Sequence, residues 1–525
     1  MERMHEAKRE SKHSARRWAP LGLATVLLAG GVLAGCGSDT AKTGNGSGSA
    51  EGGKPAESGA PVKLQVAMAA SGLPAADADD VKKTIDKKLN VDLQLTAIAS
   101  GDDYKNQIRV RLSGGNYPDL FSVDFPDVKE FADKGLLLDL TPYMDKELRA
   151  AKDFVVGLTP NILKKVTVNG KQYAIPRTAD VPFSSMWVRK DWLEKLNLKV
   201  PTTLEEFAAV AKAFTEQDPD GNGKKDTYGI TGAKLDSFAT ILGAYGVGLP
   251  GSFYQKDGKV MNAYYDPGMP EALKYIKSLF DAGVVDPELM TNKGNVEVQK
   301  AFQGKAGLIF KGWTDIAKDE FVAQYKAINP KADWVQMTPV KGPGGQFDGS
   351  YDYDRPSRYW VIPKALEKDK AKLQKVFDVL NYISGKEGNT LVMYGLEGKH
   401  YNMKDGKLVP TDLMAKEGNY FNLYQFTGRP NKDYLAIKFP NQAEATEFAI
   451  KTPRISSFDS SVIPPTGFNK ADADRFAEEE MIKFVTGKRP IAEYADFLKT
   501  LETTFKYKTY VDEAAKQIKE QGFVK

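Results

Sequence analysis

The chain has 525 residues, among them 73 lysines and arginines, 69 aspartates and glutamates, three histidines and one cysteine. A formal net charge of +4 is too small for a surface that binds the phosphates of nucleic acid, which argues against a nucleic-acid partner. One cysteine allows no disulfide within the chain, so we expect the size of the core to provide stability.

The first 36 residues have the composition of a secretory signal. Residues 1–17 contain six basic and three acidic side chains, residues 21–33 are apolar or small, and Cys36 follows small residues. The apolar stretch is shorter than the roughly 20 residues that span a bilayer. The tetrapeptide LAGC resembles the bacterial lipobox, which implies a signal peptide over residues 1–35 and a lipid on Cys36 that anchors the protein on the extracytoplasmic face of the cell membrane. The alternative is an ordinary signal peptide with an incidental cysteine.

Residues 36–61 are rich in Gly and Ser and contain no aromatic or large aliphatic side chain. Such a segment buries too little apolar surface to fold, so we predict a flexible tether. The folded body then begins near Val62 and spans roughly 460 residues, which is too long for one core and predicts two lobes.

Few residues with catalytic chemistry remain after the signal. His5 and His13 lie within it, so a Ser–His triad or a zinc site would depend on His400 alone. The sequence contains no G-x-S-x-G, H-E-x-x-H or P-loop motif. A glycosidase with two carboxylates needs no histidine and stays possible. The motifs therefore favour a binding protein over an enzyme.

The body opens with a regular alternation of strands and helices. Residues 62–68 and 91–98 alternate apolar and polar side chains as strands do, and residues 77–90 between them have the period of a helix. A helix over 103–115, ended by two glycines, leads into a buried strand over 117–124. This βαβαβ pattern predicts a parallel sheet flanked by helices.

A second run of the same kind follows. Residues 184–192 read as a strand that enters a helix, and residues 201–217 as a helix that begins after a proline. A helix over 268–285 and a helix–strand pair over 295–313 continue the pattern. Residues 357–364 form a later strand, and helical segments dominate from there to the end.

Five segments in register carry a family resemblance: YKNQIRVRLSGGNYPDLFSVD from Tyr104, YAIP from Tyr173, WVRKDWLEKLNLKVPTTLEEF from Trp187, FQGKAGLIFKGW from Phe302 and YGLEGKHY from Tyr394. They resemble the extracellular solute-binding proteins, family 1, of ABC importers, in the oligosaccharide-binding lipoprotein subgroup of Gram-positive bacteria. The resemblance covers nearly all of residues 62–525.

The resemblance implies a two-lobed α/β fold of the periplasmic-binding-protein type II, with a hinge between two mostly parallel sheets flanked by helices. The first lobe would comprise residues 62–181 and about 357–415, and the second residues 182–356 and about 416–525. A carbohydrate would bind in the cleft between the lobes. The protein, as a monomer, would deliver this ligand to an ABC permease.

Two candidate cleft residues directly follow predicted strands, where ligands of α/β sheets bind. The carboxylate of Asp124 could accept hydrogen bonds from sugar hydroxyls, or it could cap the helix that follows. The ring of Trp313 could cover the apolar face of a sugar, or it could simply pack in the core.

The segment GSYDYDRPSRYW, residues 349–360, interleaves aromatic, acidic and basic side chains near an expected lobe crossing. Strand alternation would place Tyr351 and Tyr353 on one side, so we consider both as ligand-binding residues. Arg355 and Arg358 would bind a carboxylate if the ligand is a uronic sugar. The alternative is a solvated edge or hinge loop.

Three further candidates lie elsewhere in the chain. Trp187 and Arg189 point the same way along a predicted strand. Either both face the cleft, or Arg189 simply pairs with an acid. Glu397 belongs to a polar and aromatic cluster with His400, and we expect that histidine to be structural rather than catalytic.

The segment DPDGNGKKD after the predicted helix 201–217 has the oxygen spacing of the front half of an EF-hand loop. The predicted calcium ligands are the side chains of Asp218, Asp220, Asn222 and Asp226 and the backbone carbonyl of Lys224. Gly229 replaces the bidentate glutamate, so this is not a true EF-hand. Some solute-binding proteins that this chain resembles hold calcium in such a loop, which implies a structural ion; the alternative is a metal-free turn.

The leading hypothesis from the sequence is a lipid-anchored receptor that binds an oligosaccharide. A glycoside hydrolase with two carboxylates is an alternative from another functional class. A receptor for peptides or other polar solutes is a third possibility.

Overall fold

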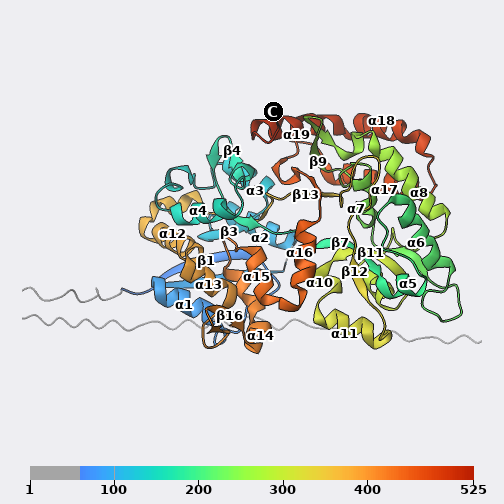
Figure 1. Cartoon of the computed structure of the whole chain (residues 1–525). Coiled ribbons are helices and arrows are strands. Elements are labelled where there is room, and N and C mark those ends of the chain that lie inside the picture. Colours follow the sequence, from blue (N-terminus) through green and yellow to red (C-terminus); the bar gives the residue numbers. More distant parts are fainter. Residues whose placement is uncertain (1–58, 100, 525) are drawn as a thin grey trace, which may run out of the picture. The chain divides into compact units, whose positions relative to one another are not determined.

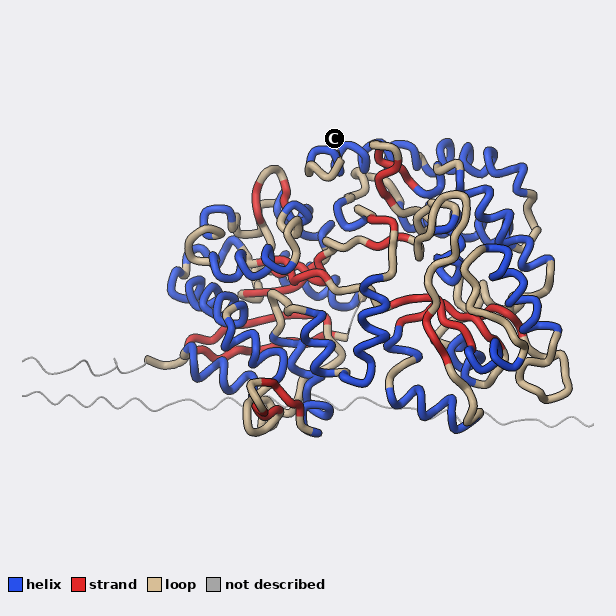
Figure 2. Tube along the Cα trace, viewed as in Figure 1, coloured by secondary structure: helices blue, strands red, loops and turns tan. Residues whose placement is uncertain are grey.

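The computed structural model describes residues 59–99 and 101–524 (Figure 1). They contain one five-stranded and one four-stranded β-sheet, which are the main sheets of the fold, and four two-stranded sheets. The predicted lipidation site at Cys36, the signal and most of the tether lie outside the described residues. The described chain is one compact unit in which helices flank both sheets (Figure 2). None of its described helices is long and apolar enough to cross a membrane.

The first sheet has five strands in the order β2 (Val91–Ile98), β1 (Val62–Ala69), β3 (Leu120–Val123), β14 (Pro356–Val361) and β6 (Ile175–Ala179). Strands β2, β1 and β3 are parallel, whereas β14 is antiparallel to both of its neighbours. The first three strands follow the predicted βαβαβ order, with α1 (Asp80–Leu89) and α2 (Asp102–Ser113) between them.

Helix α1 shows how local sequence sets these elements. The Asp79 carboxylate accepts a hydrogen bond from the backbone N–H of Lys82, which caps the helix N-terminus. Val81 and Ile85 lie one turn apart and are buried. Asn90 ends the helix in the left-handed conformation that asparagine tolerates.

The second sheet has four strands in the order β12 (Trp334–Gln336), β7 (Ser184–Arg189), β11 (Ala306–Gly312) and β8 (Tyr228–Thr231). Only the β11–β8 pair is parallel. The α/β fold is thus confirmed, but both sheets are mixed rather than mostly parallel. The strands next to the lobe crossings, β6, β7 and β14, enter their sheets antiparallel to a neighbour.

Helix α6 (Leu204–Glu216) covers the second sheet at short range. Its N-terminus is capped by the Thr203 hydroxyl, which accepts from the N–H of Glu206, while the Glu206 carboxylate accepts from Thr202. Strand β8 can approach this helix because Gly229 lacks a side chain; a Cβ there would lie 2.5 Å from the carbonyl oxygen of Ala211. Gly229, which stands where an EF-hand loop has its bidentate glutamate, is therefore required for the packing of β8 on α6.

The chain crosses between the sheets three times. It leaves β6 and enters β7 over residues 180–183. It returns through β13 (Ser350–Tyr351), which pairs in parallel with β17 (Ile455–Ser456), where the third crossing lies.

The segment between β14 and β17 packs on the first lobe as far as about residue 438, which lies beyond the expected boundary near residue 415. Its helices are α12 (Lys370–Ser384), α13 (Lys386–Tyr394), α14 (Asp412–Phe421), α15 (Asn431–Lys438) and α16 (Ala443–Lys451). The hydroxyl of Tyr424 donates to Asp79, and the ring of Phe426 lies 4.6 Å from that of Trp360. Residues 439–451 contact the second lobe, where Gln442 donates to Asp319 and the ring of Phe439 meets that of Trp313. Helical periodicity shows that these segments bury one face, but it does not show which lobe receives it.

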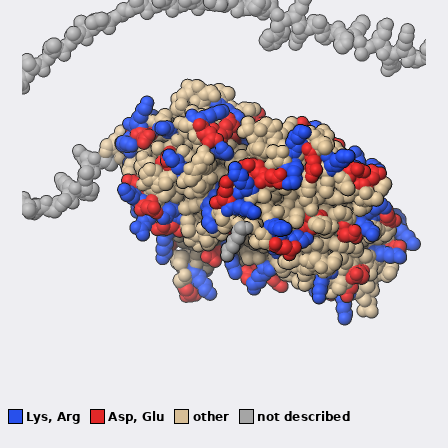
Figure 3. Space-filling model, turned by 90° about the horizontal axis from the view of Figure 1, so that it is seen from above, with Lys and Arg blue, Asp and Glu red and all other residues tan. Residues whose placement is uncertain are grey.

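The last helices complete the second lobe. They are α17 (Lys470–Val485), α18 (Tyr494–Phe505) and α19 (Tyr507–Glu520), and α17 packs on α8 (Gly268–Asp281). On the face shown in Figure 3, basic and acidic side chains are interspersed rather than gathered by sign.

Candidate functional site

A cleft of about 1420 Å³ is lined by residues of both lobes. The first lobe contributes the carboxyl ends of β1 and β3 and the start of β14, which is the edge where α/β sheets bind ligands. The second lobe contributes residues 234–236 and 249–252 together with parts of α17 and α19. The cleft exceeds the usual 300–1,000 Å³ of small-molecule pockets, so it has room for an oligomeric ligand.

Aromatic rings line this cleft beside polar groups. Phe125, at the start of α3 (Phe125–Asp133), stacks on Tyr359 with the ring centroids 5.6 Å apart. Tyr351 and Phe183 are half-buried and come from two of the lobe crossings. Such rings can cover the C–H faces of a sugar while neighbouring carboxylates and guanidinium groups bind its hydroxyls.

Asp124 lies in the cleft wall, as the sequence predicts. It occupies the N-cap position of α3, but its side chain makes no capping hydrogen bond. Instead, its carboxylate lies 2.7 Å from the ammonium group of Lys105 on α2. The carboxylate keeps most of its surface exposed and is free to accept a ligand hydroxyl.

Tyr351 and Arg355 also line the cleft. The Tyr351 hydroxyl donates to the carbonyl oxygen of Asp180 at 3.0 Å. The ring of Tyr353 contacts that of Tyr351, with the centroids 5.1 Å apart, but Tyr353 itself is outside the cleft lining and points to solvent. Strand β13 ends at Tyr351, so strand alternation does not extend over residues 352–355: Asp352 also borders the cleft and pairs with the buried ammonium group of Lys165.

Trp313 is fully buried and does not line the cleft. Its ring packs between Phe183 and Phe439, with centroid distances of 6.0 and 5.5 Å. The residue therefore takes the core-packing alternative, because helix α10 (Trp313–Ile316) begins at Trp313 itself and turns its side chain inward. Phe183, which rests on it, is the ring that reaches the cleft.

Three other candidates also lie away from the cleft. Trp187 is buried and donates its indole N–H to the carbonyl oxygen of Lys311. Arg189 is buried and forms two hydrogen bonds of 2.7 and 2.6 Å with the carboxylate of Asp191, so it pairs with an acid. Glu397 is exposed in the loop before β15 (Tyr401–Lys404) and is not part of the cleft lining.

The only histidine of the described residues has a structural environment. Nδ1 of His400 accepts from the N–H of Leu396 at 2.9 Å, and Nε2 lies 2.9 Å from the carboxylate of Glu417. The ring is buried against Phe421. Both nitrogens are thus engaged within the first lobe, away from the cleft lining.

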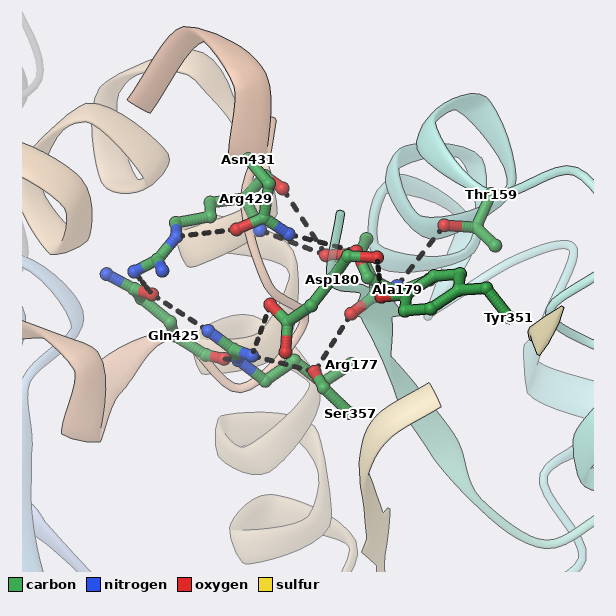
Figure 4. A network of polar contacts seen from close by, with 10 residues as sticks. Thr159, Arg177, Ala179, Asp180, Tyr351, Ser357, Gln425, Arg429 and Asn431 are labelled. Atoms are coloured by element: carbon green, nitrogen blue, oxygen red, sulfur yellow. Dashed lines mark hydrogen bonds and ion pairs between the residues drawn. The ribbon is translucent and has the colours of Figure 1, made fainter. Parts of the chain in front are cut away.

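A network of arginines that the sequence reasoning missed lies behind the floor of the cleft (Figure 4). Arg177 and Arg429 both point at the side-chain oxygen of Gln425, at 3.1 and 2.7 Å. Arg177 also donates to Ser357 and lies 3.8 Å from Asp180. Ser357 and Asp180 line the cleft, so the network meets the ligand space through these two residues.

Burial explains the electrostatics of this network. It lowers the pKa of Arg177 to about 10, against the opposing effect of Asp180 and with added repulsion from Arg429 and Arg358. Burial likewise lowers the pKa of Arg358 and of Arg429. The signal that could have found Arg177 is its place two residues before a predicted lobe crossing.

The predicted calcium loop forms a tight turn whose donors converge only in part. Both oxygens of Asp218 accept backbone N–H groups from residues 221–223. The amide nitrogen of Asn222 donates to Asp220 at 2.8 Å and to Asp226 at 3.0 Å. Burial, followed by contact with Asp218 and the charge of Asp226, raises the pKa of Asp220.

The fit of this loop to a metal ion is therefore mixed. Its oxygen donors suit calcium. Yet no group of three or more His, Cys, Asp or Glu side chains in the described part of the chain is arranged to hold a metal ion. The amide of Asn222 lies between Asp220 and Asp226, and the ammonium group of Lys305 lies 2.7 Å from Asp226.

Comparison with known proteins identifies the family of this chain. The family model described as bacterial extracellular solute-binding protein matches residues 55–390. The chain belongs to this family. Membership favours ligand binding over hydrolysis as the role of the cleft, because a solute-binding protein captures its ligand without transforming it.

Two curated members from Bacillus subtilis align with most of the chain. The polygalacturonan/rhamnogalacturonan-binding protein YtcQ is 28% identical over 402 residues, which cover 74% of this chain and 75% of YtcQ. Lipoprotein LipO is 27% identical over 427 residues, which cover 79% and 78% of the two chains.

The fold of this solute-binding protein agrees with solved structures. An HMO-binding, ABC-transporter-associated solute-binding protein from Bifidobacterium longum infantis superposes with a TM-score of 0.68 over 87% of this chain and 98% of that one. The two sequences are 18% identical, so the likeness concerns the fold.

Proposed function

We propose that this solute-binding protein captures an oligosaccharide in the cleft between its lobes and delivers it to an ABC permease. The observation that carries the proposal is a cleft of about 1420 Å³ in which aromatic rings alternate with carboxylates and arginines. This combination suits a polyhydroxylated ligand with apolar ring faces.

Each contact class has candidate residues. Phe183 and Tyr351 offer ring faces to a sugar. Asp124, Asp180 and Arg355 offer exposed or half-buried polar groups to its hydroxyls. Asp124 belongs to the first lobe and the other four residues to the crossings, whereas Asp236 and Asp459 line the cleft from the second lobe. A ligand that also reaches this second-lobe wall would favour the closed arrangement of the lobes.

The names of relatives support a carbohydrate ligand and a permease partner. They include YtcQ and a fructooligosaccharide ABC transporter substrate-binding protein, FusA, of Streptococcus pneumoniae, whose match covers 44% of this chain. We further propose that a lipid on Cys36 anchors the protein on the extracytoplasmic face of the cell membrane. The LAGC tetrapeptide and the similarity to lipoprotein LipO support this. The mass of the mature N-terminus would test the anchor.

We also propose that the loop over residues 218–226 takes up a structural calcium ion once its acids rearrange. The oxygen spacing and the crowding of Asp218, Asp220 and Asp226 support this proposal. Solved relatives include FusA described as an EF-hand mutant and an alginate-binding protein described as without calcium ion.

The experiment that tests the function is a thermal-shift panel of neutral and acidic oligosaccharides with the mature protein. We expect at least one glycan to raise the melting temperature and to change tryptophan fluorescence with a saturable dose response. In parallel, reducing ends are measured in mixtures with stoichiometric protein. Release of reducing ends would favour the glycoside hydrolase, and a response to peptides alone would favour a peptide receptor.

A further inference from the structure

The floor of the cleft carries an excess of positive charge. Arg358 is part of its lining, and behind it Arg177 and Arg429 share the side-chain oxygen of Gln425. Arg177 and Arg358 are directly opposite each other on the antiparallel strands β6 and β14, a pairing in which like charges repel. Among residues 59–99 and 101–524, Asp180 is the only acid within ion-pair distance of any of the three.

The excess charge is held away from bulk water. The side chain of Arg177 is 12% exposed, and Arg358 and Arg429 are half-buried. Arg429 stacks on Tyr434 at 3.7 Å, which is an aromatic rather than an anionic partner. A buried charge without a counter-charge is costly, so proteins rarely keep one that nothing neutralises.

Part of this charge is accessible to a ligand. Arg358 lines the cleft and uses one N–H group for the carbonyl oxygen of Ala69 at 3.1 Å. Arg355, also in the lining, is exposed and forms no ion pair among the described residues. Arg177 reaches the lining indirectly, through Ser357 and Asp180.

The rest of the cleft offers no comparable cation. The lysines of its lining are neutralised by acids of the same lining: Lys105 by Asp124, Lys234 by Glu478 and Lys470 by Asp474. The second-lobe wall also contains Asp236 and Asp459. Positive potential is therefore confined to the first-lobe floor around Arg355 and Arg358.

We propose that this floor binds the carboxylate of an acidic sugar, so that the ligand is an oligosaccharide with a uronic or comparably anionic residue. The inference rests on the proposed function and specifies its ligand class. Planar carboxylates and guanidinium groups form paired, charge-assisted hydrogen bonds, and the acids on the opposite wall would fix the direction in which the ligand lies.

The first experiment extends the oligosaccharide panel. Binding of acidic members supports the inference. Binding of neutral members alone overturns it while leaving the proposed function intact, and a response to no glycan overturns both. For the best acidic member, isothermal titration then compares the free acid with its methyl ester. We expect the acid to bind about tenfold more tightly at low salt, and the difference to shrink at high salt.

Variants assign the effect to the floor. Arg358→Gln should lower the affinity for the acid about tenfold and leave that for the ester within about twofold. Arg358→Lys should restore part of the preference, since it returns the charge without the planar fork. Arg355→Gln, at an exposed position, tests the same charge without endangering the fold.

The matched control is Arg149→Gln, which removes an exposed arginine of α4 (Arg149–Leu158) outside the cleft lining. It should leave both affinities unchanged. Equal losses for acid and ester in Arg358→Gln and Arg355→Gln would show a structural role and overturn the inference.

Discussion

Two aromatic residues that touch each other, Phe183 and Trp313, differ in what they can contact. Phe183 is half-buried and lines the cleft, whereas Trp313 is fully buried behind it. The backbone N–H of Trp313 also donates to the carbonyl oxygen of Phe183 at 3.0 Å, so the two residues are fixed relative to each other. A ligand meets the smaller ring, and the larger ring supports it from the core.

Phe183→Ala should therefore lower ligand affinity about tenfold with a modest effect on stability, because it removes a stacking surface. Trp313→Leu should destabilise the fold by roughly 2–4 kcal/mol, somewhat less than the about 3–5 kcal/mol for truncation of a buried aromatic to alanine, and change affinity less. Titration and urea unfolding of both variants would separate these effects. The opposite pattern, with affinity lost only in Trp313→Leu, would mean that Trp313 itself contacts the ligand.

On the scale of elements, the loop over residues 218–226 connects α6 to β8, and its acids repel one another. The raised pKa of Asp220 reflects burial beside Asp218 and Asp226. A bound divalent cation would remove this repulsion and stabilise the native state in proportion to its occupancy.

We therefore expect calcium to raise the melting temperature and EGTA to reverse the rise, with little effect of magnesium. Asp220→Asn should abolish the response. Asp257→Asn, in the turn between β9 (Phe253–Lys256) and β10 (Lys259–Asn262), is a control that should retain it. Identical melting temperatures in calcium and EGTA would leave the loop as a metal-free turn.

The elements also show how far the sequence could predict this protein. The strands and helices of both βαβ runs follow from periodicity and capping residues, and Asp124, Tyr351 and Arg355 follow from their places after strands or at a crossing. Periodicity reports that a ring is buried or exposed on one face, but not which neighbour covers it. For that reason the sequence suggests Trp313 as a cleft residue, and it does not predict the network of Arg177 and Arg429 near Asp180.

The whole molecule depends on the crossings that join its lobes, and one of them buries an isolated carboxyl group. Asp348 precedes β13, and its N–H donates to the carbonyl oxygen of Pro453 beside β17. Its side chain is 3% exposed, and neither carboxylate oxygen has a hydrogen-bond partner. Burial raises the pKa of Asp348 to about 7, against the opposing charge of Arg454.

This carboxyl group should make global stability fall as the pH rises. Between about pH 4 and pH 7 the unfolded chain releases the Asp348 proton while the native state retains it, so the native state binds more protons and loses stability across that window. Asp348→Asn removes the ionisable group, and it should raise the free energy of unfolding at pH 8 by up to about 4 kcal/mol. At pH 5 the gain should be much smaller, because the native carboxyl group is still protonated and the pH is only about one unit above the pKa of the carboxyl group in the unfolded chain.

Urea unfolding at both pH values measures the difference. Asp405→Asn, exposed in the turn between β15 and β16 (Lys407–Pro410), should change stability equally at both. A gain that is the same at pH 5 and pH 8, or a loss at pH 8, would mean that Asp348 is ionised in the native state and that Arg454 compensates for its burial.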